Sequence, residues 1–277
     1  MAEAVPAPFD RPDRAFNSLP GWTWVGTYGG YFLQADLLAD FEHGFFTRQW
    51  AGRGPDELAA AISAGVSIHR TRQIHGATVL GADEAAAEPW PAADGLVSRD
   101  GGQSLWVCGA DCTPVLLADG NTGQVAACHA GWRGVAGRIL PEAIRQLERS
   151  GSRRQDLRVA LGPAISGTVY QVQTDVALEV ALSLGPEAAA LPLDAEIDQA
   201  EWLEELKRCS GLIEDPQPGR VRLDIRAAAL RQLQLEGLTA AQISVCPLCT
   251  ASEPLLFHSW RRDQVKAVQW SGIVAQA

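Results

Sequence analysis

The chain has 277 residues, of which 47% are hydrophobic and 20% charged, a composition typical of a globular protein rather than a disordered or fibrous one. Its formal net charge of −10 disfavours non-specific attraction to DNA or to anionic membranes, so we expect no nucleic-acid or membrane partner. The sequence has no apolar run long enough for a transmembrane helix, and its first ten residues lack the features of a secretory signal.

The first half of the chain is predicted to consist of an arm followed mainly by strands. Residues 1–20 carry four prolines and few apolar pairs, and we expect an arm there, ahead of one domain over residues 21–277. Two short apolar runs on either side of Gly29 and Gly30 predict a hairpin over residues 22–33. Further strands are predicted over residues 43–48, 66–69, 77–80, 94–98, 105–108, 115–118 and 124–129, with a helix over residues 56–64.

The second half alternates helices with strands. Helices are predicted over residues 134–149, with a kink or break at Pro141, over the acidic segment 175–209, with interruptions near Pro186 and Pro192, and over residues 227–235. Strands are predicted over residues 157–161, 221–225, 243–246, 255–258 and 265–270. The runs over 105–108 and 115–118 are apolar at consecutive positions, which is typical of strands covered on both faces. We therefore expect a single α/β (α+β) domain of mixed β-sheets flanked by helices.

Three side chains at the edges of predicted strands and loops form the candidate site. Two imidazoles and one thiolate, from His75, His129 and Cys112, would give a metal three ligands and leave a fourth position open, as in catalytic zinc sites. Their spacing matches no structural zinc motif. A nucleophile–base pair of Cys112 and His129 is the alternative. A blue-copper centre fits less well, because the sole methionine, Met1, cannot supply an axial ligand from the core.

The other cysteines and histidines are more often packing residues. The six cysteines are irregularly spaced, which argues against a disulfide scaffold and favours reduced thiols in a cytoplasm. A cysteine pair near the C-terminus has redox-motif spacing but lacks a thioredoxin-like context or a second pair. We expect packing roles for Cys108, Cys128, His69, His258, Cys246 and Cys249, whereas His43 stays ambiguous.

The glycine turn after His129 is a candidate anion site. Free backbone N–H groups at the start of the following helix attract anions, and Arg133 could bind phosphate with two hydrogen bonds. The alternative is a plain strand-to-helix turn with a solvated arginine.

Taken together, these segments resemble the laccase-domain family, also called polyphenol oxidase or multifunctional purine nucleoside phosphorylase. The most specific pieces are Gln73-Ile-His-Gly76, Ala110-Asp-Cys112 and His129-Ala-Gly-Trp-Arg-Gly134. Further matches occur, in the family's order, over residues 43–48, 93–97, 113–119, 161–165, 223–224, 249–250 and 257–263.

The resemblance implies a zinc ion held by His75, Cys112 and His129. It also implies phosphorolysis of adenosine, inosine, guanosine and S-methyl-5′-thioadenosine, with some adenosine deamination. Purine nucleosides and phosphate are then the expected partners of a monomer or small homo-oligomer.

The resemblance also suggests residues that contact substrate. Arg48 and Arg133 stand at the family's arginine positions and would contact phosphate or nucleoside. Gln73 and Gly131 belong to the matching motifs and would bind substrate. Asp111 would act as an acid–base group or would orient a ligand, so that the predicted catalytic residues are Asp111 and Arg133.

Other functions stay open at this point. The first is a copper-dependent polyphenol oxidase, although five histidines are too few for a full multi-copper cluster. The second is a metal-free hydrolase that uses Cys112 and His129. The third is a non-catalytic metal-binding module, which would retain metal without turning over nucleosides.

Overall fold

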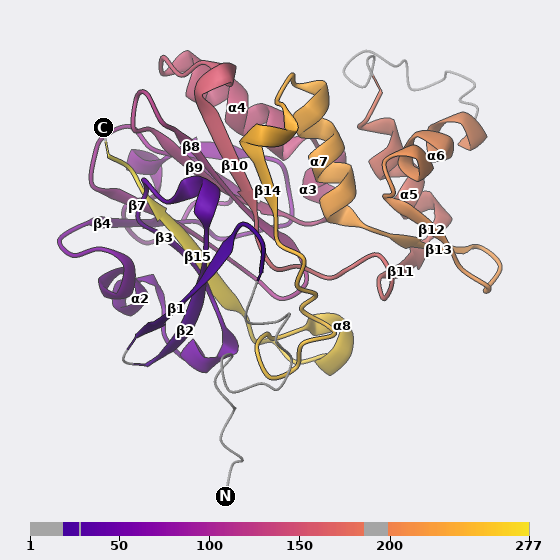
Figure 1. The fold of residues 1–277 in the computed structure, drawn as a ribbon, viewed down its shortest axis with the longest axis horizontal. Coiled ribbons are helices and arrows are strands. Elements are labelled where there is room, and N and C mark those ends of the chain that lie inside the picture. Colours follow the sequence, from indigo (N-terminus) through magenta and orange to yellow (C-terminus); the bar gives the residue numbers. More distant parts are fainter. Residues whose placement is uncertain (1–18, 28, 186–198, 277) are drawn as a thin grey trace, which may run out of the picture.

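The fold is built on two large sheets, as the computed structural model in Figure 1 shows. The structure describes residues 19–27, 29–185 and 199–276. Within these ranges, two six-stranded sheets are accompanied by a three-stranded sheet, and the large sheets mix antiparallel with parallel pairs. This mixed α/β architecture confirms the predicted fold class.

The strands of the two large sheets come from distant parts of the chain. The first sheet is ordered β1 (Trp22–Thr27), β2 (Gly30–Ala35), β3 (His43–Phe46), β15 (Gln269–Val274), β7 (Gln103–Gly109) and β4 (Ser67–Arg70). The second is ordered β14 (Ile243–Val245), β10 (Leu157–Leu161), β8 (Thr113–Asp119), β9 (Val125–Ala130), β6 (Gly95–Val97) and β5 (Val79–Gly81).

Strand β8 shows how the sequence pattern sets the layers. Successive side chains of a strand point to opposite faces of its sheet. Val115 and Leu117 belong to the core shared with the helices, while Leu116 and Ala118 belong to the core between the two large sheets. All four are fully buried, which confirms the prediction of a strand covered on both faces.

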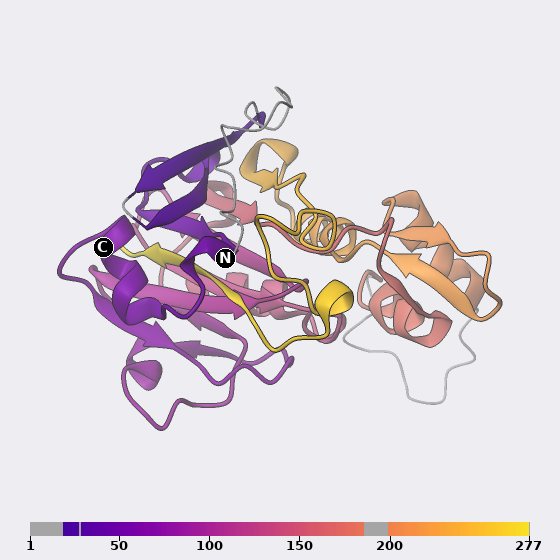
Figure 2. The same ribbon diagram turned by 90° about the horizontal axis from the view of Figure 1, so that it is seen from below.

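The helices cover the outer faces and one end of the molecule. Helices α4 (Ile139–Arg149) and α7 (Ile225–Leu235) pack on the second sheet, and α2 (Pro55–Ile62) lies against the outer face of the first. Figure 2 shows the small sheet at one end, beside α5 and α6. It contains β11 (Gln171–Gln173), β13 (Arg220–Leu223) and β12 (Leu212–Glu214), next to α5 (Thr174–Leu182) and α6 (Gln199–Arg208). None of the described helices is both long and apolar enough to cross a bilayer.

The predicted helix over residues 134–149 is divided at a different place than expected. The structure has a short α3 (Trp132–Ala136) and then α4, and the break falls at Arg138, whose φ of 62° is left-handed. Pro141 lies in the first turn of α4, where a missing N–H removes no intrahelical hydrogen bond. The prediction of a break at Pro141 was therefore wrong.

Two predicted strands near the C-terminus also need correction. Residues 254–256 form a turn and residues 257–258 belong to no strand, because the N–H groups of Leu256 and Phe257 both donate to the carbonyl of Glu253. The predicted strand over residues 265–270 begins only at Gln269 and continues to Val274. The short strands β11 and β12 were not predicted. Most of the predicted arm (residues 1–18) and the segment with the two interrupting prolines (residues 186–198) lie outside the described residues.

Candidate metal centre

Three predicted ligands meet where the two large sheets approach each other. His75 lies in the loop between β4 and β5, Cys112 directly precedes β8, and His129 lies in β9. Their ligand atoms all lie within 4.8 Å of one another. His129 is buried, Cys112 is partly buried and His75 is exposed, so the cluster opens to solvent on one side. Two imidazoles and a thiolate are a donor set that suits zinc and leaves room for a further ligand.

A buried carboxylate, Asp94, orients two of the ligands. Its Oδ1 lies 2.9 Å from Nδ1 of His129 and accepts a 2.9 Å hydrogen bond from the N–H of His75. Its Oδ2 accepts the N–H groups of Ile74 and Gly76 at 3.1 and 2.7 Å. A carboxylate on Nδ1 leaves Nε2 of the imidazole free for a metal, as in many metal sites. The sequence showed Asp94 only as part of a matching segment.

Two residues of the site have strained backbones. His75 and Asp111 have φ angles of 60° and 93°, a left-handed region that costs side-chain-bearing residues about 1–3 kcal/mol and is enriched at functional sites. Asp94 stabilises the first. The carboxylate of Asp111 accepts the hydroxyl of Thr250 and the backbone N–H of Arg261, both at 2.7 Å. These contacts favour an orienting role for Asp111, and proton transfer by its carboxylate stays a prediction.

The ionisable groups of the cluster influence one another. Burial would raise the pKa of the Cys112 thiol, but hydrogen bonds and charges from His129 and His75 lower that pKa to about 7. Burial would lower the pKa of His129, but Asp94 and Cys112 raise it. Burial opposes ionisation of Asp94, yet its pKa is lowered by the hydrogen bond with His129 and by backbone N–H groups. Without a metal, part of the Cys112 thiol therefore ionises near neutral pH, beside an imidazole whose raised pKa favours its protonated form.

Two of the predicted substrate residues are engaged in structural hydrogen bonds. The Gln73 amide donates to the Cys108 carbonyl at 2.7 Å and accepts the Cys108 N–H at 2.8 Å, which ties the His75 loop to β7. Arg48 donates to the carbonyl of Pro254 through its guanidinium and to that of Leu256 through its backbone N–H. A direct contact of either side chain with substrate stays a prediction.

The glycine turn lies directly against the cluster. A Cβ added at Gly131 would be 2.8 Å from Sγ of Cys112. Arg133 is exposed, with its guanidinium 4.4 Å from the ring centroid of Trp132. The helix that follows Gly131 is α3, with only five residues, so the anion attraction expected here depends more on Arg133 than on the helix.

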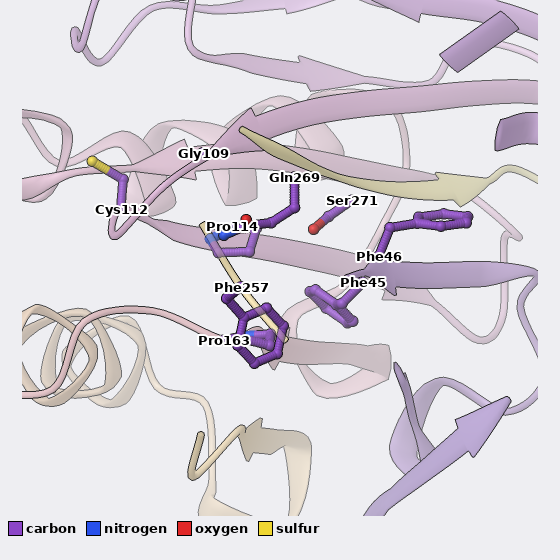
Figure 3. Close-up of a pocket in the computed structure, with 9 residues that line it drawn as sticks. All are labelled: Phe45, Phe46, Gly109, Cys112, Pro114, Pro163, Phe257, Gln269 and Ser271. Atoms are coloured by element: carbon purple, nitrogen blue, oxygen red, sulfur yellow. The ribbon is translucent and has the colours of Figure 1, made fainter. Parts of the chain in front are cut away.

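A small cavity lies on the other side of Cys112. Its volume of about 10 Å³ has room for about one water molecule, so it is too small for a nucleoside. In Figure 3 the Cys112 sulfur points away from the rings of Phe45 and Phe257. The lining residues are Phe45, Phe46, Gly109, Cys112, Pro114, Pro163, Phe257, Gln269 and Ser271.

The remaining histidines lie outside the cluster. The ring nitrogens of His43 bond to the backbone of Phe41 and Ala35, and the packing role expected for His69 is confirmed by its bonds to Ser67 and Ala82. His258 lies in no described strand, contrary to expectation, and its buried Nε2 has no hydrogen-bond partner among the described residues.

The cysteines outside the cluster are unpaired. All six cysteines of the chain are free thiols, as predicted. Cys128 and Cys246 are fully buried, and burial raises the pKa of each to about 12. Cys249 is also buried, whereas Cys108 is only partly so.

Comparison with known proteins places the chain in a family. Residues 55–276 match the family described as multi-copper polyphenol oxidoreductase laccase. The chain belongs to this laccase-like family. A protein of Synechocystis sp. named purine nucleoside phosphorylase is 41% identical over 260 residues, covering 92% of this chain and 97% of that protein. A second protein of that name, from Deinococcus radiodurans, is 35% identical over 250 residues, covering 90% of this chain and 83% of that protein.

Two solved structures share the fold. The crystal structure of YlmD from Geobacillus stearothermophilus has a TM-score of 0.73 at 24% identity and covers 91% of this chain and 98% of that one. A hypothetical protein, YfiH, from Bacillus licheniformis has a TM-score of 0.72 at 22% identity, covering 91% and 99%. These similarities confirm the architecture.

Proposed function

We propose that the chain is a zinc-dependent purine nucleoside phosphorylase for adenosine, inosine, guanosine or S-methyl-5′-thioadenosine. The observation that carries this proposal is the cluster of His75, Cys112 and His129, which is open on one side and belongs to a laccase-like chain. The names of the curated relatives support the substrate class. In phosphorolysis, a phosphate oxygen bonds to ribose C1′ while the C1′–N9 bond breaks. The electron pair of the broken C1′–N9 bond goes to the purine, which takes up a proton.

The chain's own residues would position the reactants. Bound zinc would supply a Lewis acid. Asp94 holds His129 so that Nε2 faces the cluster, and it holds the backbone of His75. Arg133 is exposed beside the cluster and would contact phosphate, whereas Arg48 would contact substrate only if its guanidinium left the carbonyl that it now bonds. Holding the reactants together can lower a barrier by about 7–11 kcal/mol.

Three exposed apolar side chains are neighbours, in sequence, of residues in the site region. Ile74, Val169 and Trp260 are large side chains that stay exposed, and each directly precedes a polar residue of the site region in sequence. Exposed apolar side chains beside polar groups are a common lining for a flat, partly apolar ligand. In the proposed complex the purine base would contact such side chains, while its ribose and the phosphate would contact polar groups.

One alternative has support from a specific observation. The lowered pKa of Cys112 beside His129 would also suit a metal-free thiol hydrolase. A copper polyphenol oxidase is disfavoured, because the cluster holds three ligands and both His43 and His69 bond elsewhere. Adenosine deamination is a further proposal, which inosine formation without phosphate would support. We also propose a cytoplasmic monomer or small homo-oligomer, and the free thiols support the compartment.

Metal analysis with a phosphate-dependent assay of purine release tests the proposal. We expect about one zinc per chain as the three-ligand cluster implies, purine release only with phosphate, and loss of both metal and activity in Cys112→Ala and His129→Ala. Cys209→Ala is the matched control, since this partly buried thiol lies outside the cluster. Activity that survives both ligand substitutions would refute the site, and release without phosphate would refute the reaction.

A further inference from the structure

Arg261 is held beside the cluster without a carboxylate partner for its guanidinium. Its backbone N–H donates to Asp111, the residue before Cys112, at 2.7 Å. Its Nη1 donates to the carbonyl of Gln171 at 2.7 Å, and the guanidinium carbon lies 4.7 Å from the ring centroid of Tyr170. Among the ion pairs of the described residues, none involves this guanidinium. The guanidinium is thus held in one orientation, and no carboxylate of the described residues neutralises its positive charge.

Arg133 brings a second cation from another element. It follows Gly131, whose backbone lies against the sulfur of Cys112, and it stacks on Trp132. No carboxylate of residues 19–27, 29–185 or 199–276 forms an ion pair with it. Two guanidinium groups without a carboxylate partner among the described residues therefore lie beside a cluster that is open on one side.

Tyr170, whose ring contacts the Arg261 guanidinium, is influenced by several charged groups of this region. Burial raises its pKa to about 12, the negative charges of Cys112 and Asp111 act in the same direction, and Arg261 and Arg133 oppose them. All four groups therefore lie within electrostatic reach of one phenol. At neutral pH the phenol keeps its proton and can donate a hydrogen bond to an anion.

We propose that Arg261, with Arg133 and the hydroxyl of Tyr170, forms the subsite that binds inorganic phosphate beside the cluster. The proposal deepens the proposed function and rests on it for the identity of the oxyanion. A guanidinium group can bind a phosphate group with two parallel hydrogen bonds. An arginine that is already fixed by stacking loses little side-chain conformational entropy on binding. The hydrogen bond from Nη1 to the Gln171 carbonyl and the ring of Tyr170 supply that fixation.

The test compares Arg261→Met with Arg261→Lys and with a control, Arg145→Met. Arg145 is an exposed residue of α4 that pairs with Glu142, so its loss removes one positive charge elsewhere. Inorganic phosphate is titrated into each zinc-loaded protein by calorimetry, and KM is measured separately for phosphate and for inosine. Because the Asp111 contact uses the backbone of Arg261, these substitutions preserve it.

We expect Arg261→Met to weaken phosphate binding about 10- to 100-fold, the usual effect of losing a charged hydrogen-bond donor. KM for phosphate should rise in parallel, KM for inosine should stay within about twofold, and lysine should restore part of the affinity. An unchanged phosphate affinity in Arg261→Met would overturn the subsite even if the wild type catalyses phosphorolysis. A parallel loss of phosphate affinity, inosine affinity and thermal stability would overturn it too, as a structural effect.

The calorimetric arm separates this inference from the proposed function. If the wild-type protein binds phosphate through Arg261 but releases no purine, the subsite stands and the phosphorylase proposal fails. If the wild-type protein binds no phosphate at all, the subsite is refuted.

Discussion

A single methyl group at Gly131 should push the cluster apart. The φ and ψ angles of Gly131 are −73° and 173°, an extended conformation that alanine adopts without strain. Gly131→Ala therefore tests space and not backbone freedom. The new Cβ would lie 2.8 Å from Sγ of Cys112 and 3.6 Å from Cδ2 of His75.

The expected magnitude follows from the first of these distances. Non-bonded carbon atoms prefer about 3.5–4.0 Å and sulfur needs at least as much, so the Gly131 methyl and the Cys112 sulfur must separate by about 1 Å. Inserting a methyl into a packed region typically costs about 1–3 kcal/mol. If the Cys112 sulfur moves to make room, this free-energy cost destabilises the metal-bound state. Zinc affinity should then drop about 5- to 150-fold, since about 1.4 kcal/mol corresponds to a factor of ten.

Competition against a chelator of known affinity measures the change in zinc affinity, and a thermal melt checks the fold. Gly109→Ala is the matched control. Its Cβ would also touch two ligands of the cluster, but at ordinary distances, 3.4 Å from the Cys112 carbonyl and 3.7 Å from Cδ2 of His129. We expect the control to keep its zinc affinity within about twofold, as ordinary contacts do. Wild-type affinity in Gly131→Ala, or an equal loss in both variants, would refute the reasoning.

Three further predictions concern the ligand support, the thiol and the core. Asp94→Asn keeps the shape of the side chain but removes the negative charge that lies against Nδ1 of His129. Zinc affinity should therefore fall about 10- to 100-fold in the same competition assay. In metal-free protein, alkylation of Cys112 should increase as pH rises through about 7, because its lowered pKa yields thiolate above that pH. Zinc should protect it, and mass spectrometry after digestion will locate the modified residue. Gly272→Ala would place a methyl 2.6 Å from the Trp106 ring, so Tm should fall by about 2–10 °C without loss of metal binding.

Much of the fold could be predicted because burial determines which positions along a strand or helix are apolar. The consecutive apolar residues of β8 indicated a strand between two layers, and the structure buries both of its faces. The break between α3 and α4 could not be predicted from the pattern of apolar residues, because it depends on the left-handed backbone of Arg138. Pro141 causes no break, since proline is tolerated in the first turn of a helix. Residues 255–258 have strand-forming side chains, but the local hydrogen bonds to the carbonyl of Glu253 override that propensity.

The ligands of the site could be predicted, but their support could not. His75, Cys112 and His129 are reactive residue types at the edges of strands and loops, where functional groups gather. Asp94 acts on groups 18 to 35 residues away in the sequence. No local pattern encodes such contacts. Arg261 was similarly hidden, because only the folded chain brings its N–H to Asp111, 150 residues earlier.

Asp94 and Asp111 connect the cluster to different parts of the molecule. The buried carboxylate of Asp94 bonds to the backbone of the segment 74–76 and to the ring of His129, so it orients metal ligands. Asp111 precedes a ligand but bonds to Thr250 and Arg261, so it joins the cluster to the C-terminal segment. The metal site and the proposed phosphate site therefore share one rigid link through Asp111. This arrangement would keep a bound phosphate at a fixed distance from the metal, which is what a reaction between two bound substrates requires.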